Sequence, residues 1–372
     1  MDFKKQLTST VAAGALLAFA APVDVVAGEA NLGNDKVNVS LGGRIHRHIV
    51  HIDDGFRDGV FHGSGSSGNS ELWLSGSGKV TESVTMGAYV RWDLPKQGSG
   101  VSFGSTTGAQ VSSDGANTHK YEYIYFKHAS MGTLTLGDAD SGANGTMNGN
   151  YGSFAGDPGS SASATDITTG TAGAFGGGEV SAFIKYLDAG MDTNNRVVYR
   201  SPAMGGFSLG ADIEQGGGGG AGVKWAGTVS GVSAKAGIGF ENGGGGNELR
   251  GGSAAIKHPS GLHLALNYGD MDVDDGSESA TTTDYETMRI VAGYESSVSS
   301  LGKTNVSVSY HEAEDVSGTG DDGESMMIAI NQSLDSVGGK IVLQYENLSF
   351  SNTAGDDLND IDVVLLETAF NF

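Results

Sequence analysis

Segment after segment of this chain alternates apolar with polar or small side chains, and this period of two constrains the fold more than any other feature. In residues 262–268, for example, leucines and a tyrosine alternate with His263 and Asn267. Because successive side chains of a β-strand point to opposite faces, such segments predict strands with two different faces. No segment keeps its apolar residues at the spacing of a helix for more than two turns, so we expect an all-β protein.

The order of these segments predicts a closed barrel. Connections after odd-numbered strands are mostly long, above all 139–194, whereas those between them are tight turns. An even strand number with short turns at one end and long loops at the other is how bacterial outer-membrane barrels are built. We therefore expect a 16-stranded antiparallel transmembrane β-barrel. The sixteen predicted strands are residues 37–50, 69–80, 84–94, 119–128, 133–138, 195–201, 206–214, 221–230, 232–241, 249–258, 262–270, 284–297, 303–313, 324–334, 339–350 and 361–372.

The N-terminal residues have the composition of an export signal. Lys4 and Lys5 form a short positive region, and residues 11–21 form an apolar stretch too short to span a bilayer comfortably. Candidate cleavage sites lie among residues 20–30, and we expect cleavage near Ala27 because the first alternating segment begins only at Val37. The predicted division is a cleaved secretory signal peptide at residues 1–27 and a β-barrel at residues 28–372.

Composition limits the partners and the chemistry. The chain has 44 acidic and 21 basic residues, a formal charge of −23, and would repel a phosphate backbone, so we expect no nucleic-acid partner. It would attract cations instead, as permeants or as bound divalent ions. The absence of cysteine excludes zinc fingers, thiol enzymes and disulfide frameworks.

Two motifs suggest chemistry that their context does not support. Residues 206–210 fit the G-x-S-x-G nucleophile pattern, but that pattern needs a strand-to-helix turn and this segment continues as a strand. Residues 271–283 offer hard oxygen ligands in a loop, without the EF-hand spacing, so Ca²⁺ or Mg²⁺ binding there would be irregular and weak. The candidate ligands are Asp272, Asp274, Asp275 and Glu278. We expect no other cofactor and no enzyme activity.

Several stretches resemble the Gram-negative outer-membrane porins, especially the general porins of alphaproteobacteria. The similar stretches are VSLGGRIHRHIVHIDDG (39–55), GKVTESVTMGAYVRWDL (78–94), LTLGDADSGANGTMNG (134–149) and NRVVYRSPAMGGFSLGADI (195–213). The terminal Phe372, which closes an alternating strand, also resembles the signal of the outer-membrane barrel-assembly machinery. This resemblance implies a homotrimeric barrel in the bacterial outer membrane, surrounded by lipid and lipopolysaccharide, whose long third loop folds inward and narrows the pore.

The resemblance also implies a constriction between acids on that loop and a wall that includes basic residues. The matching loop acids are Asp138, Asp140, Asp157 and Asp166, and the wall residues are Arg44, His46, Glu71, Arg91, Arg196 and Arg200. Glu71 departs from the family pattern, which often has a basic residue there, and makes the wall less positive. Arg47 lies at lipid-facing parity, so it lies either near a membrane interface or against a neighbouring subunit, and the family's trimer favours the second. Residues 179–187 also show a strand pattern and could form an extra hairpin within the loop.

We therefore expect a general diffusion porin, a water-filled channel for small polar solutes and ions. Acidic and basic residues of lumen parity roughly cancel, so acids at the mouth and on the third loop predict a preference for cations. One alternative is a substrate-specific channel, for example for sugars, with an aromatic track from Tyr121, Tyr123, Tyr125 and Trp73 if these face inward. Another is a surface protein or adhesin for which the barrel is only an anchor.

Overall fold

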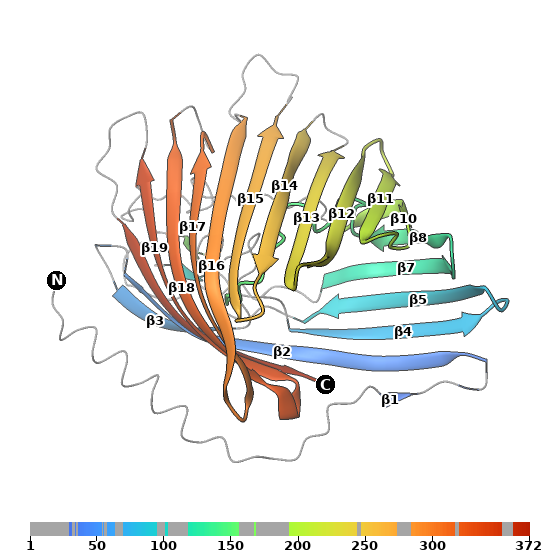
Figure 1. The fold of residues 1–372 in the computed structure, drawn as a ribbon, viewed down its shortest axis with the longest axis horizontal. Coiled ribbons are helices and arrows are strands. Elements are labelled where there is room, and N and C mark those ends of the chain that lie inside the picture. Colours follow the sequence, from blue (N-terminus) through green and yellow to red (C-terminus); the bar gives the residue numbers. More distant parts are fainter. Residues whose placement is uncertain are drawn as a thin grey trace.

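The protein, described here from a computed structural model, is a closed antiparallel barrel of sixteen main strands (Figure 1). The main strands are β2 (Asn38–Asp53), β4 (Glu71–Lys79), β5 (Val84–Asp93), β7 (Thr118–His128), β8 (Gly132–Ala139), β10 (Asn194–Arg200), β11 (Phe207–Glu214), β12 (Gly219–Val229), β13 (Val232–Asn242), β14 (Glu248–Lys257), β15 (Leu262–Asp272), β16 (Tyr285–Ser299), β17 (Gly302–Glu314), β18 (Asp322–Leu334), β19 (Gly339–Ser351) and β20 (Ile361–Asn371). The structure describes residues 30–31, 34, 36–53, 55, 58–63, 70–94, 101–102, 118–155, 167–168, 193–243, 247–273, 284–316, 320–351 and 360–372.

Each main strand pairs with the next along the chain, and β20 pairs with β2 to close the barrel. In Figure 1 the red C-terminal strands therefore reach the blue β2. The short β1 (Ala30–Asn31) and β3 (Asp58–Gly63) also pair with β2, while β6 (Val101–Ser102) and β9 (Ile167–Thr168) form a separate parallel pair. The sixteen predicted strands are confirmed, with ends that agree within three residues.

Tight turns at one end of the barrel allow this pairing. Between β12 and β13, Ser230 and Gly231 both have positive φ (51° and 84°), which a two-residue type I′ hairpin requires. A short 3-10 helix, Asp335–Val337, connects β18 to β19. Within the described ranges, no helix is long and apolar enough to cross a membrane.

The outer surface of the barrel is apolar, as a surface in contact with lipid must be. Exposed aliphatic side chains alternate along its strands with inward-facing residues, as in β15, where Leu264 and Leu266 are each 49% exposed. Large aromatic side chains also face outward, including Trp92, Tyr199, Phe207, Tyr268, Tyr294 and Phe372. Such residues favour the membrane–water interfaces of outer-membrane barrels.

The largest buried apolar cluster lies inside the barrel and covers only part of its inner wall. It joins the inner faces of β2, β14–β16 and β18–β20 to Phe154 and Ala155, which follow β8. The most deeply buried side chains include Ile52, Val342, Leu348 and Ile361, all without solvent exposure. We call the inner faces of β15–β20, with residues 46–52 of β2, the covered wall.

Candidate functional site

The described beginning of the third loop, residues 140–155, runs along the inner wall of the barrel. Hydrogen bonds tie it successively to β11, β14, β17 and β19: Gly142 N to Asp212 Oδ1 (2.6 Å), Ser253 Oγ to the Thr146 carbonyl (2.7 Å), Asn305 Nδ2 to the Tyr151 carbonyl (3.2 Å) and Ala155 N to Gln344 Oε1 (2.8 Å). Nine strand spacings of about 4.8 Å separate β10 from β19, roughly 43 Å, and the segment spans up to about 53 Å when extended. Its length therefore suits a path around the inner wall, which confirms that this loop folds inward.

Glycines on the inner wall make room for this segment. A Cβ on Gly237 would lie 2.7 Å from the Thr146 carbonyl oxygen, and one on Gly222 would lie 2.6 Å from Thr146 Cγ2. Cβ atoms on Gly210 and Gly239 would overlap Gly142 and Thr146 respectively. Side chains at these inward-facing positions would push the loop away from the wall, so the glycines of β11–β13 form a track on which it lies.

A buried carboxylate anchors the start of the loop. Asp212 Oδ1 accepts hydrogen bonds from Ser141 Oγ (2.8 Å), from Gly142 N (2.6 Å) and from Gly220 N (3.0 Å). Its Oδ2 receives the Arg196 guanidinium at 2.7 Å. Since the Asp212 side chain has no solvent exposure, these partners are what compensate its buried charge.

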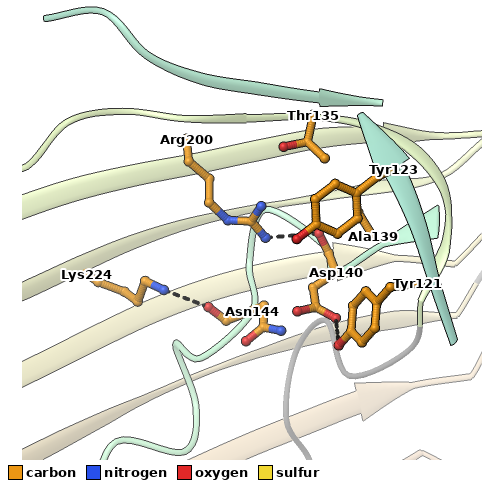
Figure 2. A pocket seen from close by; sticks show the side chains of 8 residues that line it. All are labelled: Tyr121, Tyr123, Thr135, Ala139, Asp140, Asn144, Arg200 and Lys224. Atoms are coloured by element: carbon orange, nitrogen blue, oxygen red, sulfur yellow. Dashed lines mark hydrogen bonds between the residues drawn. The ribbon is translucent and has the colours of Figure 1, made fainter. Parts of the chain in front are cut away.

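Beyond this anchor, the loop faces a polar wall that is open to the lumen. We call the lumen-facing residues of β4, β5, β7, β8 and β10–β12 that the loop leaves at least partly exposed, together with Arg44, the open wall. Between it and the loop lies a cavity of about 230 Å³, drawn in Figure 2. Its lining residues are Tyr121, Tyr123, Thr135, Ala139, Asp140, Asn144, Arg200 and Lys224. Figure 2 shows the tyrosines on one side, Arg200 and Lys224 on the other, and Asp140 and Asn144 between them.

The cavity brings one predicted loop acid close to one predicted wall base. Asp140 Oδ1 accepts a hydrogen bond from the Tyr121 hydroxyl (2.7 Å). Arg200 Nη2 donates to the Asp140 and Ser141 carbonyls (3.0 and 2.9 Å), so the guanidinium holds the loop backbone. Lys224 Nζ donates to the Asn144 carbonyl at 2.9 Å and holds the next turn of the loop.

A second group of charged side chains lies where β2, β4 and β5 adjoin. Glu71 is buried and receives Arg44 Nε at its Oε1 and Arg91 Nε at its Oε2, both at 2.8 Å. Arg91 also reaches Asp93 (3.1 Å) and lies over the Tyr121 ring, 4.7 Å from its centroid. Glu71, the departure from the family pattern, therefore bridges two of the predicted wall bases.

Four tyrosines project into the lumen from the open wall, all half-buried. Tyr89 lies on β5, and Tyr121, Tyr123 and Tyr125 alternate along β7. The rings of Tyr89 and Tyr123 stack at 5.4 Å, and the centroids along β7 are 6.3 and 6.5 Å apart. Tyr89 was not among the predicted aromatic residues, although its inward parity and its register opposite Tyr123 could have indicated it.

Three predicted site residues have other surroundings than expected. Asp138 pairs in register with Glu122 on the outer face of the barrel and lies 3.7 Å from His119, because the alternation of β8 continues to residue 139. Arg196 is 2% exposed in its side chain and is shared by three carboxylates, so it stabilises the loop anchor and does not face open water. His46 is buried on the covered wall, with Nδ1 3.7 Å from Glu367.

The remaining predictions fall largely outside the described residues. This holds for Asp157 and Asp166 of the loop, for residues 179–187, for the signal peptide and for three of the four suggested cation ligands, Asp274, Asp275 and Glu278. The fourth ligand, Asp272, lies 3.4 Å from Arg250 Nη2. In the part of the chain that the structure describes, no group of three or more acidic or histidine side chains could hold a metal ion.

Comparison with known proteins gives the family. A family model described as Gram-negative porin matches residues 8–353. Among solved structures, the chain is similar to a loop L8 deletion mutant of OmpT, an outer membrane protein of Vibrio cholerae (TM-score 0.60, 15% identity, covering 91% of this chain and 100% of that one). It is also similar to an anion-selective porin from Comamonas acidovorans (TM-score 0.57, 13% identity, 91% and 100%) and to a mutant of Rh. blastica porin (TM-score 0.53, 16% identity, 90% and 100%).

Comparison with curated proteins finds no match. At these identities the solved structures support the fold alone, and the family assignment rests on the match over most of the chain. The barrel, its inward loop and its polar open wall agree with that match. The chain therefore belongs to the Gram-negative porin family, the diffusion channels of the bacterial outer membrane.

Proposed function

We propose that the protein is a general diffusion porin that passes small polar solutes and ions, with a weak preference for cations, and that performs no covalent chemistry. The observation that carries the proposal is the open wall, where Arg44, Arg91 and Arg200 are only partly buried and Lys224 is exposed; Arg200 and Lys224 line the cavity together with two of the tyrosines. Charged and aromatic side chains with this exposure suit a water-filled path. Ser208 of the G-x-S-x-G pattern lies within β11, as a strand residue.

The groups of arginine and carboxylate side chains on the inner wall carry a net negative charge, which favours cations modestly. Three guanidinium groups contact five carboxylates, leaving an excess of two negative charges: Arg44, Arg91 and Arg196 with Glu71, Asp93, Asp212, Glu214 and Glu241. Carboxylates also face one another across neighbouring strands near the long-loop ends of β15–β18. These cross-strand pairs are Asp270 with Glu286, Glu286 with Glu314, and Glu312 with Glu324, and Arg250 Nε compensates Asp270 at 3.2 Å. They add a negative potential around the outer mouth, which raises the local concentration of cations.

Arg200 and Lys224 oppose this effect at the cavity, where Asp140 is the acid among the lining residues. The net preference should therefore be weak and should depend on salt, because charges at the mouth are screened beyond about 8 Å at physiological ionic strength. Reversal potentials of the purified protein in planar bilayers, measured in a salt gradient, test both parts of the proposal. We expect open channels with a cation-selective sign that weakens as salt is raised. An anion-selective sign at low salt would contradict the cation preference, and absence of conductance would favour the anchor alternative.

The proposal includes a homotrimer inserted by the barrel-assembly machinery among outer-membrane lipid and lipopolysaccharide. Its support is Arg47, which lies on the outer face of β2 and is exposed in the single chain. A lipid-facing Arg near the bilayer midplane costs about 2–4 kcal/mol, and a neighbouring subunit would remove that cost. Unheated protein should migrate on SDS gels as an oligomer that heating converts to a monomer. A folded monomer before heating would contradict the trimer.

A further inference from the structure

We infer that the tyrosines of the open wall form a binding track for neutral pyranose sugars, a substrate class within the proposed diffusion function, on which this inference rests. The track comprises Tyr89, Tyr121, Tyr123 and Tyr125. All four rings point into the lumen from adjacent strands and are neither buried in the apolar cluster nor exposed to lipid. An aromatic ring in this position presents an apolar face with a polar edge to the permeating solution.

The wall is shaped to hold these rings against it. Gly87 lies opposite Tyr125 in the register of β5 and β7, and a Cβ at Gly87 would overlap the Tyr125 ring. The ring therefore occupies the space that a side chain at residue 87 would need. Tyr89 stacks on Tyr123, with 29° between the ring planes. Contacts among the rings limit their freedom, so a solute meets a preformed surface and little side-chain entropy is lost on binding.

Hydrogen-bond donors and acceptors both lie beside the rings. Tyr121 and Tyr123 line the same cavity as the Asp140 carboxylate, the Arg200 guanidinium and the Lys224 ammonium group. Sugar hydroxyls both donate and accept, so a carboxylate together with cationic donors can satisfy them on two sides. The axial C–H groups of a pyranose can meanwhile rest on the negative face of an aromatic ring.

The size and charges of the cavity favour one neutral sugar ring at a time. At about 230 Å³ the cavity is smaller than the roughly 300–1,000 Å³ typical of sites for drug-sized ligands. Arg91, the base that lies over Tyr121, is already paired with Glu71 and Asp93. Successive rings along β7 offer further stacking positions, and weak binding at several positions is what allows a solute both to enter and to leave a channel.

The test compares maltose, which has pyranose rings, with mannitol, an acyclic polyol that cannot stack. With wild-type protein in planar bilayers, maltose should reduce the single-channel current saturably, whereas mannitol should act only through bulk viscosity. The variant Tyr89→Ala/Tyr123→Ala should weaken the apparent maltose affinity by about two- to tenfold per ring lost. The matched variant Tyr123→Phe keeps the ring and should retain the affinity. Equal effects of maltose and mannitol, or an unchanged affinity in the double Ala variant, would overturn the track.

Saturation-transfer NMR of maltose with the full chain in detergent separates this inference from the channel function. Ring protons of maltose should receive saturation from wild type and from Tyr123→Phe, and much less from the double Ala variant. The heat-dependent gel shift of each variant shows that its barrel has folded. If wild type does not conduct, the diffusion function fails while the NMR signal still decides the track. If it conducts without saturation transfer to maltose, only the track fails.

Discussion

The two walls of the lumen differ in what covers them. On the covered wall, Val342 and Val363 are at most 1% exposed and pack in the cluster that includes Phe154 of the third loop. On the open wall, Tyr123 is half-buried and Lys224 is exposed, and both line a cavity. The same alternating strand pattern thus produces a packed interior on one arc of the barrel and a polar surface on the other.

The path of the loop explains this difference. Residues 140–147 lie on the glycine track of β11–β13, and residues 151–155 continue over β16–β19. A wide barrel would otherwise expose apolar inner residues to water, and burying them is favourable by about 25 cal/mol per Å². The loop therefore closes one arc, and we expect solutes to pass along the other.

The largest effect should come from placing the same charge on each wall. Leu365→Asp would bury an unpaired carboxylate at a position that is 2% exposed, which should destabilise the barrel by several kcal/mol or prevent its assembly. Tyr123→Asp places the carboxylate at a partly exposed position beside the cavity, where water can solvate it, and this variant should fold. Assembly of each variant is measured as the fraction of heat-modifiable folded protein. Its stability is measured by urea unfolding, followed by tryptophan fluorescence. Equal losses would mean that the two walls are equally buried.

The sequence predicted the barrel well because the evidence for it is local. The alternation and the turn residues are contained within each hairpin, so sixteen strands could be placed to within three residues. The inward parity of Arg44, Arg91 and Arg200 follows from the same alternation. An aromatic track was an alternative on the condition that the tyrosines face inward. The structure shows that they do.

Contacts between distant parts of the chain could not be predicted in this way. Nothing near Arg196 in sequence indicates that Glu241, on β13, shares its guanidinium. The glycine track also depends on where residues 140–147 lie in space, so the alternation alone could not assign a role to Gly237. Asp138 was misplaced because the resemblance assigned it to the loop, although the alternation of β8 still includes it.

An intermediate effect is expected from filling the glycine track. A Cβ at Gly237 would lie 2.7–2.8 Å from the Thr146 backbone, so Gly237→Ala should push this part of the loop away from the inner wall and cost about 1–3 kcal/mol of stability. Single-channel conductance should change with it. Gly76→Ala is the matched control, because the nearest atoms to its Cβ are 3.9 Å away. If both substitutions leave conductance and unfolding unchanged, the track does not position the loop.

The smallest effect should be on selectivity, from removing one negative charge beside the open wall and one on the covered wall. Asp140→Asn neutralises an acid that lines the cavity beside Arg200, while its amide oxygen can still accept from Tyr121. A unit charge about 4 Å from an ion in water is worth about 1 kcal/mol, so the cation-to-anion permeability ratio should fall by up to roughly fivefold at low salt. Glu346→Gln removes a fully buried carboxylate that accepts from Ser325 on the covered wall, and should alter unfolding more than reversal potential. Equal shifts of the reversal potential in the two variants would place the permeation path no closer to the open wall than to the covered one.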